Sequence, residues 1–243
     1  MVHQRAAGVA KHAFSSLESL ALPHVCRLCG AKGDGEMDLC AGCRADLPWN
    51  RNPCGRCANP LPETDSHSSL CGQCASGQFP DGVDRILAPL VYDFPVDRLL
   101  LNLKFHEDLA AGRLLGELTA LGAMALDRPV DCIVPVPLDW RRRMQRGFNQ
   151  ARELARPLSA HTGLPILDDM LRRRCGAEPQ STLPLEQRRR NIRGRFLCRL
   201  PAPARVALVD DVVTSGSTVA EAARELKKAG AEWVEVWACA RTP

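Results

Sequence analysis

Four C-x-x-C pairs lie in the first third of the chain and use eight of its twelve cysteines: Cys26/Cys29, Cys40/Cys43, Cys54/Cys57 and Cys71/Cys74. A C-x-x-C turn directs two thiolates at one tetrahedral metal, and two such turns complete a zinc site with four cysteine ligands. The four pairs therefore predict two closed, structural zinc sites. Disulfides fit badly with a reducing compartment, and a redox dithiol needs one pair rather than four in series.

The partnering of the four pairs depends on the loops between them. Sequential pairing joins Cys29 to Cys40 across ten residues and Cys57 to Cys71 across thirteen. Interleaving would instead join the first pair to the third across a longer loop. Loop-closure entropy favours the sequential scheme only slightly, since doubling a loop costs ~0.6 kcal/mol. We adopt two sequential ribbons.

The segment VALVDDVVTSGST (206–218) has the composition of a sugar-phosphate site. Its first four residues predict a buried strand, so that Asp210 and Asp211 fall at the carboxyl end, where open α/β sheets bind ligands. A small, hydroxylated run then leads into a helix: Thr214, Ser215, Gly216, Ser217 and Thr218. The N–H groups and hydroxyls of such a loop can surround a phosphate at the positive end of the helix dipole. The two carboxylates can accept hydrogen bonds from sugar hydroxyls.

Simpler interpretations exist for each part of this segment. Thr218 and Glu221 match a T-x-x-E capping box, Gly216 can serve only as a turn residue, and Asp210 can cap a loop. None of these explains the acidic pair and the T-S-G-S-T run together. A P-loop and a dinucleotide fold are excluded because their glycine patterns are absent. A receiver domain is excluded because only 32 residues follow Asp211.

Alternating strand-like and helix-like segments begin at about Phe79. Apolar runs predict strands over 86–94, 132–136, 206–209 and 233–240, and helical spacing predicts helices over 96–105, 112–126, 148–160 and 218–229. This order predicts an α/β fold with a parallel sheet. We therefore divide the chain into an N-terminal segment (1–22), a double zinc ribbon (23–78) and an α/β domain (79–243).

Positive charge is concentrated in residues 141–199, which hold 15 Arg, no Lys and 5 acidic residues, a balance of 15 − 5 = +10. The rest of the chain has 17 − 23 = −6, and the total is +4. This asymmetry indicates a polyanionic partner, either small-molecule phosphates or a nucleic-acid backbone. A solvated basic face is the alternative, because charge runs alone are weak evidence.

No stretch reaches the roughly 18 to 20 apolar residues that a membrane span needs. Charged and polar residues also interrupt the first twenty residues, which therefore lack the apolar middle of a secretory signal. We expect a cytoplasmic protein, and the reducing conditions there suit metal-bound thiolates.

The 206–218 motif resembles the phosphoribosyl-pyrophosphate signature of type I phosphoribosyltransferases, and the whole chain is similar to the ComF family of competence and DNA-utilisation proteins. Several further segments carry the ComF resemblance together with the cysteine pairs: LNLKF (101–105), IVPVPL (133–138), RGFNQ (146–150), PQSTL (179–183) and RRRNIRGRF (188–196). The resemblance implies a type I phosphoribosyltransferase-like fold and a magnesium-bound phosphoribosyl pyrophosphate ligand.

The resemblance also assigns roles by position. It implies that Asp210 and Asp211 contact the ribose hydroxyls and that residues 214–218 hold the 5′-phosphate. Pro137 and Leu138 begin a pyrophosphate loop that extends to Trp140, to which four arginines add charge: Arg141, Arg142, Arg143 and Arg146. Residues 172–196 match the mobile hood that covers the site. Ala177 in that hood is a departure, because relatives often have Thr shortly before the PQ pair.

Two functions follow as hypotheses. In the first, the protein is a phosphoribosyltransferase whose acceptor the sequence does not name. In the second, it is a non-catalytic single-stranded DNA-binding factor with a link to the DNA-uptake machinery, and the basic hood and zinc module grip the strand. Phe148 and Phe196 are the only aromatic residues of segment 141–199, few for a base-stacking platform.

Overall fold

The computed structural model describes residues 23–62, 69–124, 129–174, 194–199 and 201–243, in two compact units, Met1–Leu47 and Pro48–Pro243. The predicted N-terminal segment (1–22) lies outside the described residues. The predicted boundary between the zinc ribbon and the α/β domain, after residue 78, falls within the larger unit. That the two parts fold as separate domains stays a prediction. The second group of cysteines therefore shares a unit with the sheet, whereas the first does not.

The smaller unit is a short Cys-rich ribbon. Backbone bridges pair Val25 with Lys32 and Asp34 with Met37, and the chain then enters helix α2 (Ala41–Ala45). Cys40 is the N-cap of this helix, and its sulfur accepts a hydrogen bond from the Cys43 N–H at 3.4 Å. Local hydrogen bonds and the cysteines hold this unit, since Cys26, Leu39 and Leu47 are its only buried residues among those described.

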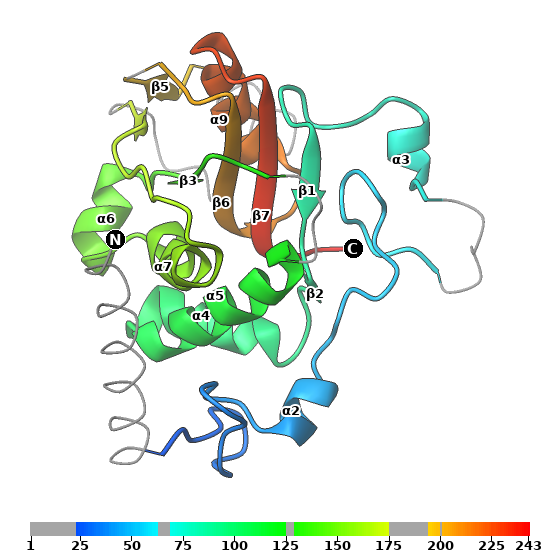
Figure 1. Cartoon of the computed structure of the whole chain (residues 1–243), viewed down its shortest axis with the longest axis vertical. Helices are drawn as coiled ribbons and strands as arrows, with labels where there is room; N and C mark the ends of the chain where they lie inside the picture. Colours follow the sequence, from blue (N-terminus) through cyan, green and yellow to red (C-terminus); the bar gives the residue numbers. More distant parts are fainter. Residues whose placement is uncertain (1–22, 63–68, 125–128, 175–193, 200) are drawn as a thin grey trace, which may run out of the picture. The chain divides into compact units, whose positions relative to one another are not determined.

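A parallel sheet forms the centre of the larger unit (Figure 1). Its strands are β1 (Arg85–Leu87), β2 (Leu90–Val91), β3 (Cys132–Pro135), β6 (Arg205–Val213) and β7 (Trp233–Arg241). Their order is β1-β7-β6-β3, and β2 continues along the end of β7. The predicted α/β fold with a parallel sheet and a Cys-rich N-terminal region is confirmed.

Helices cover both faces of the sheet. Helices α4 (Val96–His106), α5 (Leu109–Met124) and α7 (Gln150–Thr162) pack together on one face, and α9 (Ser217–Lys228) packs on the other (Figure 1). On β6, Val206 and Leu208 join the apolar core beneath α9, whereas the equally buried Ala207 and Val209 do not. This alternation is the two-residue period of a strand covered on both faces.

The second Cys-rich segment is part of the core beneath α9. Helix α3 (Gly72–Ala75) begins directly after Cys71, and all four cysteines of this segment pack with residues of the sheet such as Val213 and Val236. Asn50 holds the same region to the β1–β2 junction, donating from its side chain to the carbonyls of Ala58 and Ala88. The second ribbon is thus a component of the α/β core.

Three details differ from the sequence expectation. The strand predicted over 86–94 is two short strands, because Pro89, which has no N–H for a ladder, separates β1 from β2. Strand β6 continues to Val213, so the acidic pair lies inside the hydrogen-bonded strand and not after it. The expected loop after Pro137 contains helix α6 (Trp140–Arg146), which Asp139 caps by accepting from the Arg141 N–H at 3.1 Å.

The described ends of the hood form an antiparallel pair, β4 (Leu171–Arg173) with β5 (Phe196–Cys198). Residues 175–193, which include Ala177 and the PQSTL segment, lie outside the described residues. Within the part of the chain that the structure describes, no helix is long and apolar enough to cross a membrane.

Candidate functional site

The eight paired cysteines form two separate groups. The sulfurs of each group lie within 4.8 Å of one another: Cys26, Cys29, Cys40 and Cys43 in the first, and Cys54, Cys57, Cys71 and Cys74 in the second. Sequential pairing is therefore the arrangement present. The Cys29–Cys40 and Cys57–Cys71 sulfurs are 3.7 and 3.5 Å apart. These are the separations of tetrahedral ligands at ~2.3 Å from one zinc ion, so both groups fit a structural zinc site.

Both groups share the same local backbone geometry. The N–H of the first cysteine donates to the carbonyl five residues on, from Cys26 to Ala31 and from Cys54 to Asn59. Burial opposes ionisation of Cys26 and Cys54, but backbone N–H groups outweigh it and lower the pKa of both thiols to about 6, whereas burial raises the pKa of Cys57 to about 11 and also raises that of Cys74. Thiolates are the form that binds zinc.

The acidic pair of β6 lies beside a lysine from a different element. Lys104 of α4 forms an ion pair with the Oδ2 atom of Asp211, and both side chains are largely buried. Each carboxylate also accepts from the following backbone N–H, Asp210 from Asp211 and Asp211 from Val212, both at 2.9 Å. These contacts fix the direction of the two carboxylates before any ligand binds.

The surroundings of Asp210 raise the pKa of its carboxyl. Burial and, next, the charge of Asp211 raise the pKa of Asp210 to about 8, while Lys104 acts in the opposite sense. Two adjacent carboxylates in a partly dry site cannot both ionise without cost. A ligand that brings hydroxyl donors or a cation would therefore stabilise the negative charge at these two carboxylates.

Arginines surround this pair. Burial and Arg142 lower the pKa of Arg146, which Asp211 opposes, so this guanidinium lies within the field of the acidic pair. Its Cζ atom stands 5.1 Å from the centre of the Phe105 ring. Arg173 of β4 is buried near Arg195 and feels the charges of Asp139 and Asp210. The site therefore has an acidic centre with a basic margin.

Residues 214–216 join β6 to α9, and Ser217 and Thr218 form the beginning of that helix. Thr214 and Ser215 are exposed, and the Ser215 and Ser217 hydroxyls lie 2.9 Å apart. Gly216 is the N-cap of α9 with φ +72°, and a Cβ there would stand 2.7 Å from Pro80 Cγ. The first N–H groups of a helix have no partner within it, so the loop presents donors and hydroxyls to an anion.

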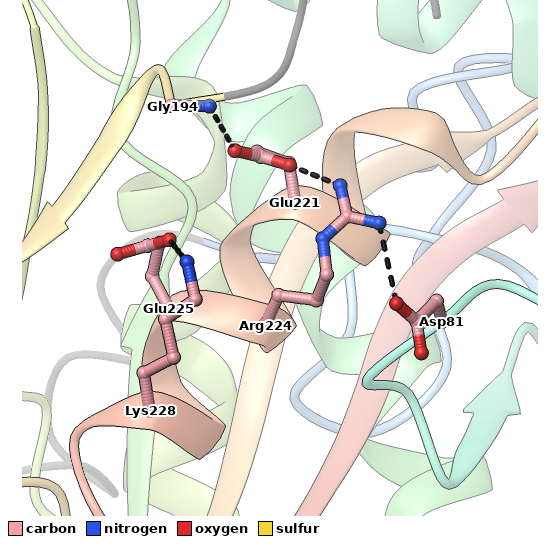
Figure 2. Close-up of polar contacts among 6 residues, drawn as sticks. All are labelled: Asp81, Gly194, Glu221, Arg224, Glu225 and Lys228. Atoms are coloured by element: carbon pink, nitrogen blue, oxygen red, sulfur yellow. Dashed lines mark hydrogen bonds and ion pairs between the residues drawn. The ribbon is translucent and has the colours of Figure 1, made fainter.

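The capping-box interpretation of Thr218 is wrong. Thr218 is the second residue of α9, and Glu221 is occupied elsewhere: it accepts from the Gly194 N–H and pairs with Arg224, which also reaches Asp81 at 3.5 Å (Figure 2). Glu221 is only 3% exposed. It therefore ties the C-terminal end of the hood to α9. That helix begins without a capping box, and its first N–H, on Ser217, lies 3.5 Å from the Ser215 hydroxyl oxygen.

The residues predicted to form a pyrophosphate loop lie at the end of β3. Pro137 and Leu138 are half-buried and precede α6, on which Arg143 is exposed. The RGFNQ motif closes this region: Gly147 ends α6 in the left-handed conformation, and Asn149 caps α7 while donating to the Val136 carbonyl at 3.0 Å. The motif thus holds the loop after β3 against α7.

Sequence reasoning missed three contributors to the site. Lys104 and Arg173 come from elements far from the acidic pair in sequence. An exposed aromatic surface was also missed: Trp140 is 50% and Phe105 65% exposed, and Arg141 lies 5.6 Å from the centre of the Trp140 ring. The LNLKF segment contained both Lys104 and Phe105, but its spacing gave no sign that Lys104 reaches β6 or that Phe105 lies under Arg146 of α6.

Comparison with known proteins gives consistent matches. Residues 17–75 match the double zinc ribbon domain family. The chain is 34% identical over 230 residues to DNA utilization protein YhgH of Escherichia coli K12, covering 92% of this chain and 99% of the relative. It is 33% identical over 215 residues to competence protein F of Haemophilus influenzae, covering 84% of this chain and 90% of the relative.

Proposed function

The chain belongs to the ComF family of competence and DNA-utilisation proteins, and from that premise we propose that it binds phosphoribosyl pyrophosphate or a related sugar phosphate in a competence or DNA-utilisation role. The observation that carries the proposal is the order of groups along one stretch of backbone. An acidic pair held by Lys104 is followed, after two valines, by hydroxyl-bearing residues at the start of α9, a helix that has no capping box.

Each part of the ligand has a matching group. Asp210 and Asp211 accept hydrogen bonds from vicinal ribose hydroxyls, which are donors at adjacent carbons. The hydroxyls of Thr214, Ser215, Ser217 and Thr218 and the first N–H groups of α9 surround the 5′-phosphate, and the helix dipole stabilises its charge. Gly216 is required at the loop because its backbone is left-handed and close to Pro80.

The pyrophosphate lies, in this proposal, between the loop after β3 and the basic margin. Pro137 and Leu138 begin the loop, and Arg143 and Arg146 supply positive charge from α6. Magnesium fits as a partner of the ligand, since Mg²⁺ is bound mainly through phosphate oxygens and water with few carboxylates. Its chemistry is to neutralise the pyrophosphate oxygens.

Turnover would be a glycosyl transfer. A nucleophile forms a bond to C1 of the ribose while the C1–O bond to pyrophosphate breaks, and the electron pair leaves with the pyrophosphate. The part of the protein residues is to orient the ribose and to stabilise the leaving group through Arg143 and Arg146. The bound ligand and its transfer are separable, so binding is the first property to test.

The test is a calorimetric titration of the full, zinc-loaded chain with phosphoribosyl pyrophosphate and magnesium. We expect the double variant Asp210→Asn/Asp211→Asn to bind at least ~10-fold more weakly, because it removes the Asp211 carboxylate and a hydrogen bond to a charged group contributes ~1.5–3 kcal/mol. Asp168→Asn is the matched control, since Asp168 pairs with Arg152 on the surface at 2.9 Å. Equal affinity in all three proteins, or no binding by the wild type, would refute the proposal.

A second candidate, single-stranded DNA binding, is favoured by the surface of α6. This helix carries three consecutive arginines between the exposed side chains of Trp140 and Met144, and Phe105 lies under Arg146. Arginines along the backbone with aromatic faces for the bases are the combination that binds single strands. The strand would lie beside the acidic pair and not across it.

DNA binding is tested by measuring affinity for an oligothymidine across salt concentrations. We expect log affinity to fall linearly with log salt, and Trp140→Ala to weaken binding by ~5- to 100-fold, since stacking contributes ~1–3 kcal/mol per base. Asp210→Asn/Asp211→Asn should bind DNA equally or more tightly while losing the small ligand. A salt-independent affinity, or none, eliminates this function.

The two zinc ions are structural in this proposal, because each group already offers four sulfurs. Eight thiolates must remain reduced to keep both ions. We therefore propose that the protein acts in the cytoplasm, in contact with the machinery that delivers or processes DNA.

A further inference from the structure

Arg241, at the end of β7, joins the second cysteine group to the phosphate loop. Its side chain is buried, with the residue 9% exposed. The Nε atom donates to the carbonyl of Cys57 at 3.3 Å, while Nη1 donates to the carbonyl of Val213 at 2.8 Å and to that of Thr214. One guanidinium therefore contacts a zinc-ligand residue and the first residue of the loop.

Backbone carbonyls hold this guanidinium in place. Arg241 is a buried cation, and an unpaired charge in a dry interior is strongly unfavourable. Its position therefore depends on the carbonyls of Cys57, Val213 and Thr214. Zinc bound by the Cys57 sulfur fixes the residue that supplies the first of these carbonyls.

A second contact runs between the same two regions. Arg56, within the Cys54–Cys57 turn, stacks over Phe79 with its Cζ 4.2 Å from the ring centre. The next residue, Pro80, lies against Gly216, where an added Cβ would be 2.7 Å from its Cγ. The beginning and the middle of the phosphate loop are therefore both held from the side of the second ribbon.

The first cysteine group offers a natural contrast. It belongs to the separate unit Met1–Leu47, whereas the second group is part of the apolar core that includes Val213 and Val219 on either side of the loop. The two zinc sites have the same ligands but different surroundings. The contacts with the loop described above come from the second group.

We propose that Arg241 is a positioning residue that couples zinc at Cys54, Cys57, Cys71 and Cys74 to the phosphate loop, so that sugar-phosphate affinity depends on the second zinc and not on the first. The proposal rests on the proposed sugar-phosphate function for its ligand. When the zinc is lost, the Cys57 carbonyl moves and Arg241 loses a partner. The Val213 and Thr214 carbonyls then lose the donor that fixes the start of the loop.

Thermodynamic reciprocity allows a test on the unmodified protein. If zinc at the second site favours ligand binding, then bound ligand must tighten that zinc by the same factor. We would measure, at equilibrium, the partition of both zinc ions between the protein and a chromogenic chelator with and without phosphoribosyl pyrophosphate, at constant excess magnesium. We expect the dissociation constant of one zinc to fall ~5- to 100-fold with ligand and that of the other to be unchanged. Equal tightening of both, or of neither, would overturn the coupling.

Variants assign the two ions and the role of the side chain. Cys40→Ser removes the first site, so its remaining zinc is the second and must be the protected one. Arg241→Lys keeps the charge but cannot bridge both regions, and we expect it to lose the protection and to speed amide exchange in residues 215–219. Arg205→Lys, at the opposite end of β6, is the matched control and should behave as wild type.

The outcomes separate the two proposals. If the wild type binds no ligand by calorimetry, the proposed function is wrong, and amide exchange still decides the positioning role. Faster exchange in Arg241→Lys but not in Arg205→Lys supports the coupling in that case. If ligand binds and Arg241→Lys keeps wild-type exchange and wild-type zinc protection, Arg241 has no positioning role.

Discussion

Replacing Asp210 by Asn should stabilise the folded protein at neutral pH. The pKa of Asp210 is raised from 3.8 to about 8 by burial and by Asp211. Below pH ~4 the folded and unfolded forms both hold the proton, so the residue has no effect. As the pH rises toward 8, the unfolded chain releases a proton that the folded chain keeps. The free energy of unfolding therefore falls across this window and levels off above it.

The magnitude follows from the same two pKa values. Each pH unit in the window lowers the free energy of unfolding by ~1.36 kcal/mol. Between pH 3.8 and pH 7 this loss would be about 4 kcal/mol. The Asp210 side chain is only half-buried, and solvent screening reduces the effect. We therefore expect Asp210→Asn to raise the free energy of unfolding by roughly 2 kcal/mol at pH 7, a gain that shrinks toward pH 5.5.

Urea unfolding of the full chain at pH 5.5, 6.5 and 7.5 measures this gain. Zinc ligands titrate equally in wild type and variant, so their contribution cancels in the difference. Asp211→Asn is the matched control with the opposite sign, because it leaves Lys104 without its ionic partner. A gain that does not change with pH, or a loss of stability in Asp210→Asn, would refute the assigned electrostatics.

Three other substitutions test separate parts of the site. Lys104→Met should destabilise the fold by ~1–3 kcal/mol by leaving Asp211 unpaired, and the double variant with Asp211→Asn should recover part of this loss in urea unfolding. Gly216→Ala should lower the stability of the fold by ~1–2 kcal/mol or more, because residue 216 has a left-handed backbone. Gly72→Ala is the control, since a Cβ at that position meets open space, and thermal unfolding compares the two variants. Glu221→Ala should cost roughly 1–3 kcal/mol and speed proteolysis of the hood; unchanged cleavage would contradict its anchoring role.

The parts of the molecule that could be predicted are contiguous in sequence. The C-x-x-C spacing predicts the zinc ligands. The acidic pair, the loop and the start of the helix lie together in one run of thirteen residues. The sheet strands were predictable because buried parallel strands are continuous apolar runs. In each case the chemical reason for the residue types lies within a few positions of the residues themselves.

The unpredicted parts depend on long-range packing. Lys104 reaches Asp211 only because α4 packs beside the sheet, and Arg241 meets Cys57 across 184 positions. Neither residue differs locally from an ordinary surface cation. Helix α6 was not predicted because its sequence, WRRRMQR, has no apolar face: none of its side chains is buried. The extension of β6 through Asp210 and Asp211 was hidden because acidic residues are poor strand formers.

The acidic pair also decides how the two candidate ligands can share one protein. A phosphodiester drawn across Asp210 and Asp211 would place its negative charge beside the Asp211 carboxylate in a partly dry site, where repulsion is stronger than in water. A ribose brings hydroxyl donors to the same place and keeps its phosphates at the loop and at the arginines. A DNA strand bound on α6 must therefore turn its phosphates toward Arg141 and its neighbours, so that only an unphosphorylated sugar hydroxyl at a strand end fits against the carboxylates. The charge pattern thus favours a sugar-phosphate ligand at the centre and restricts DNA to the basic margin.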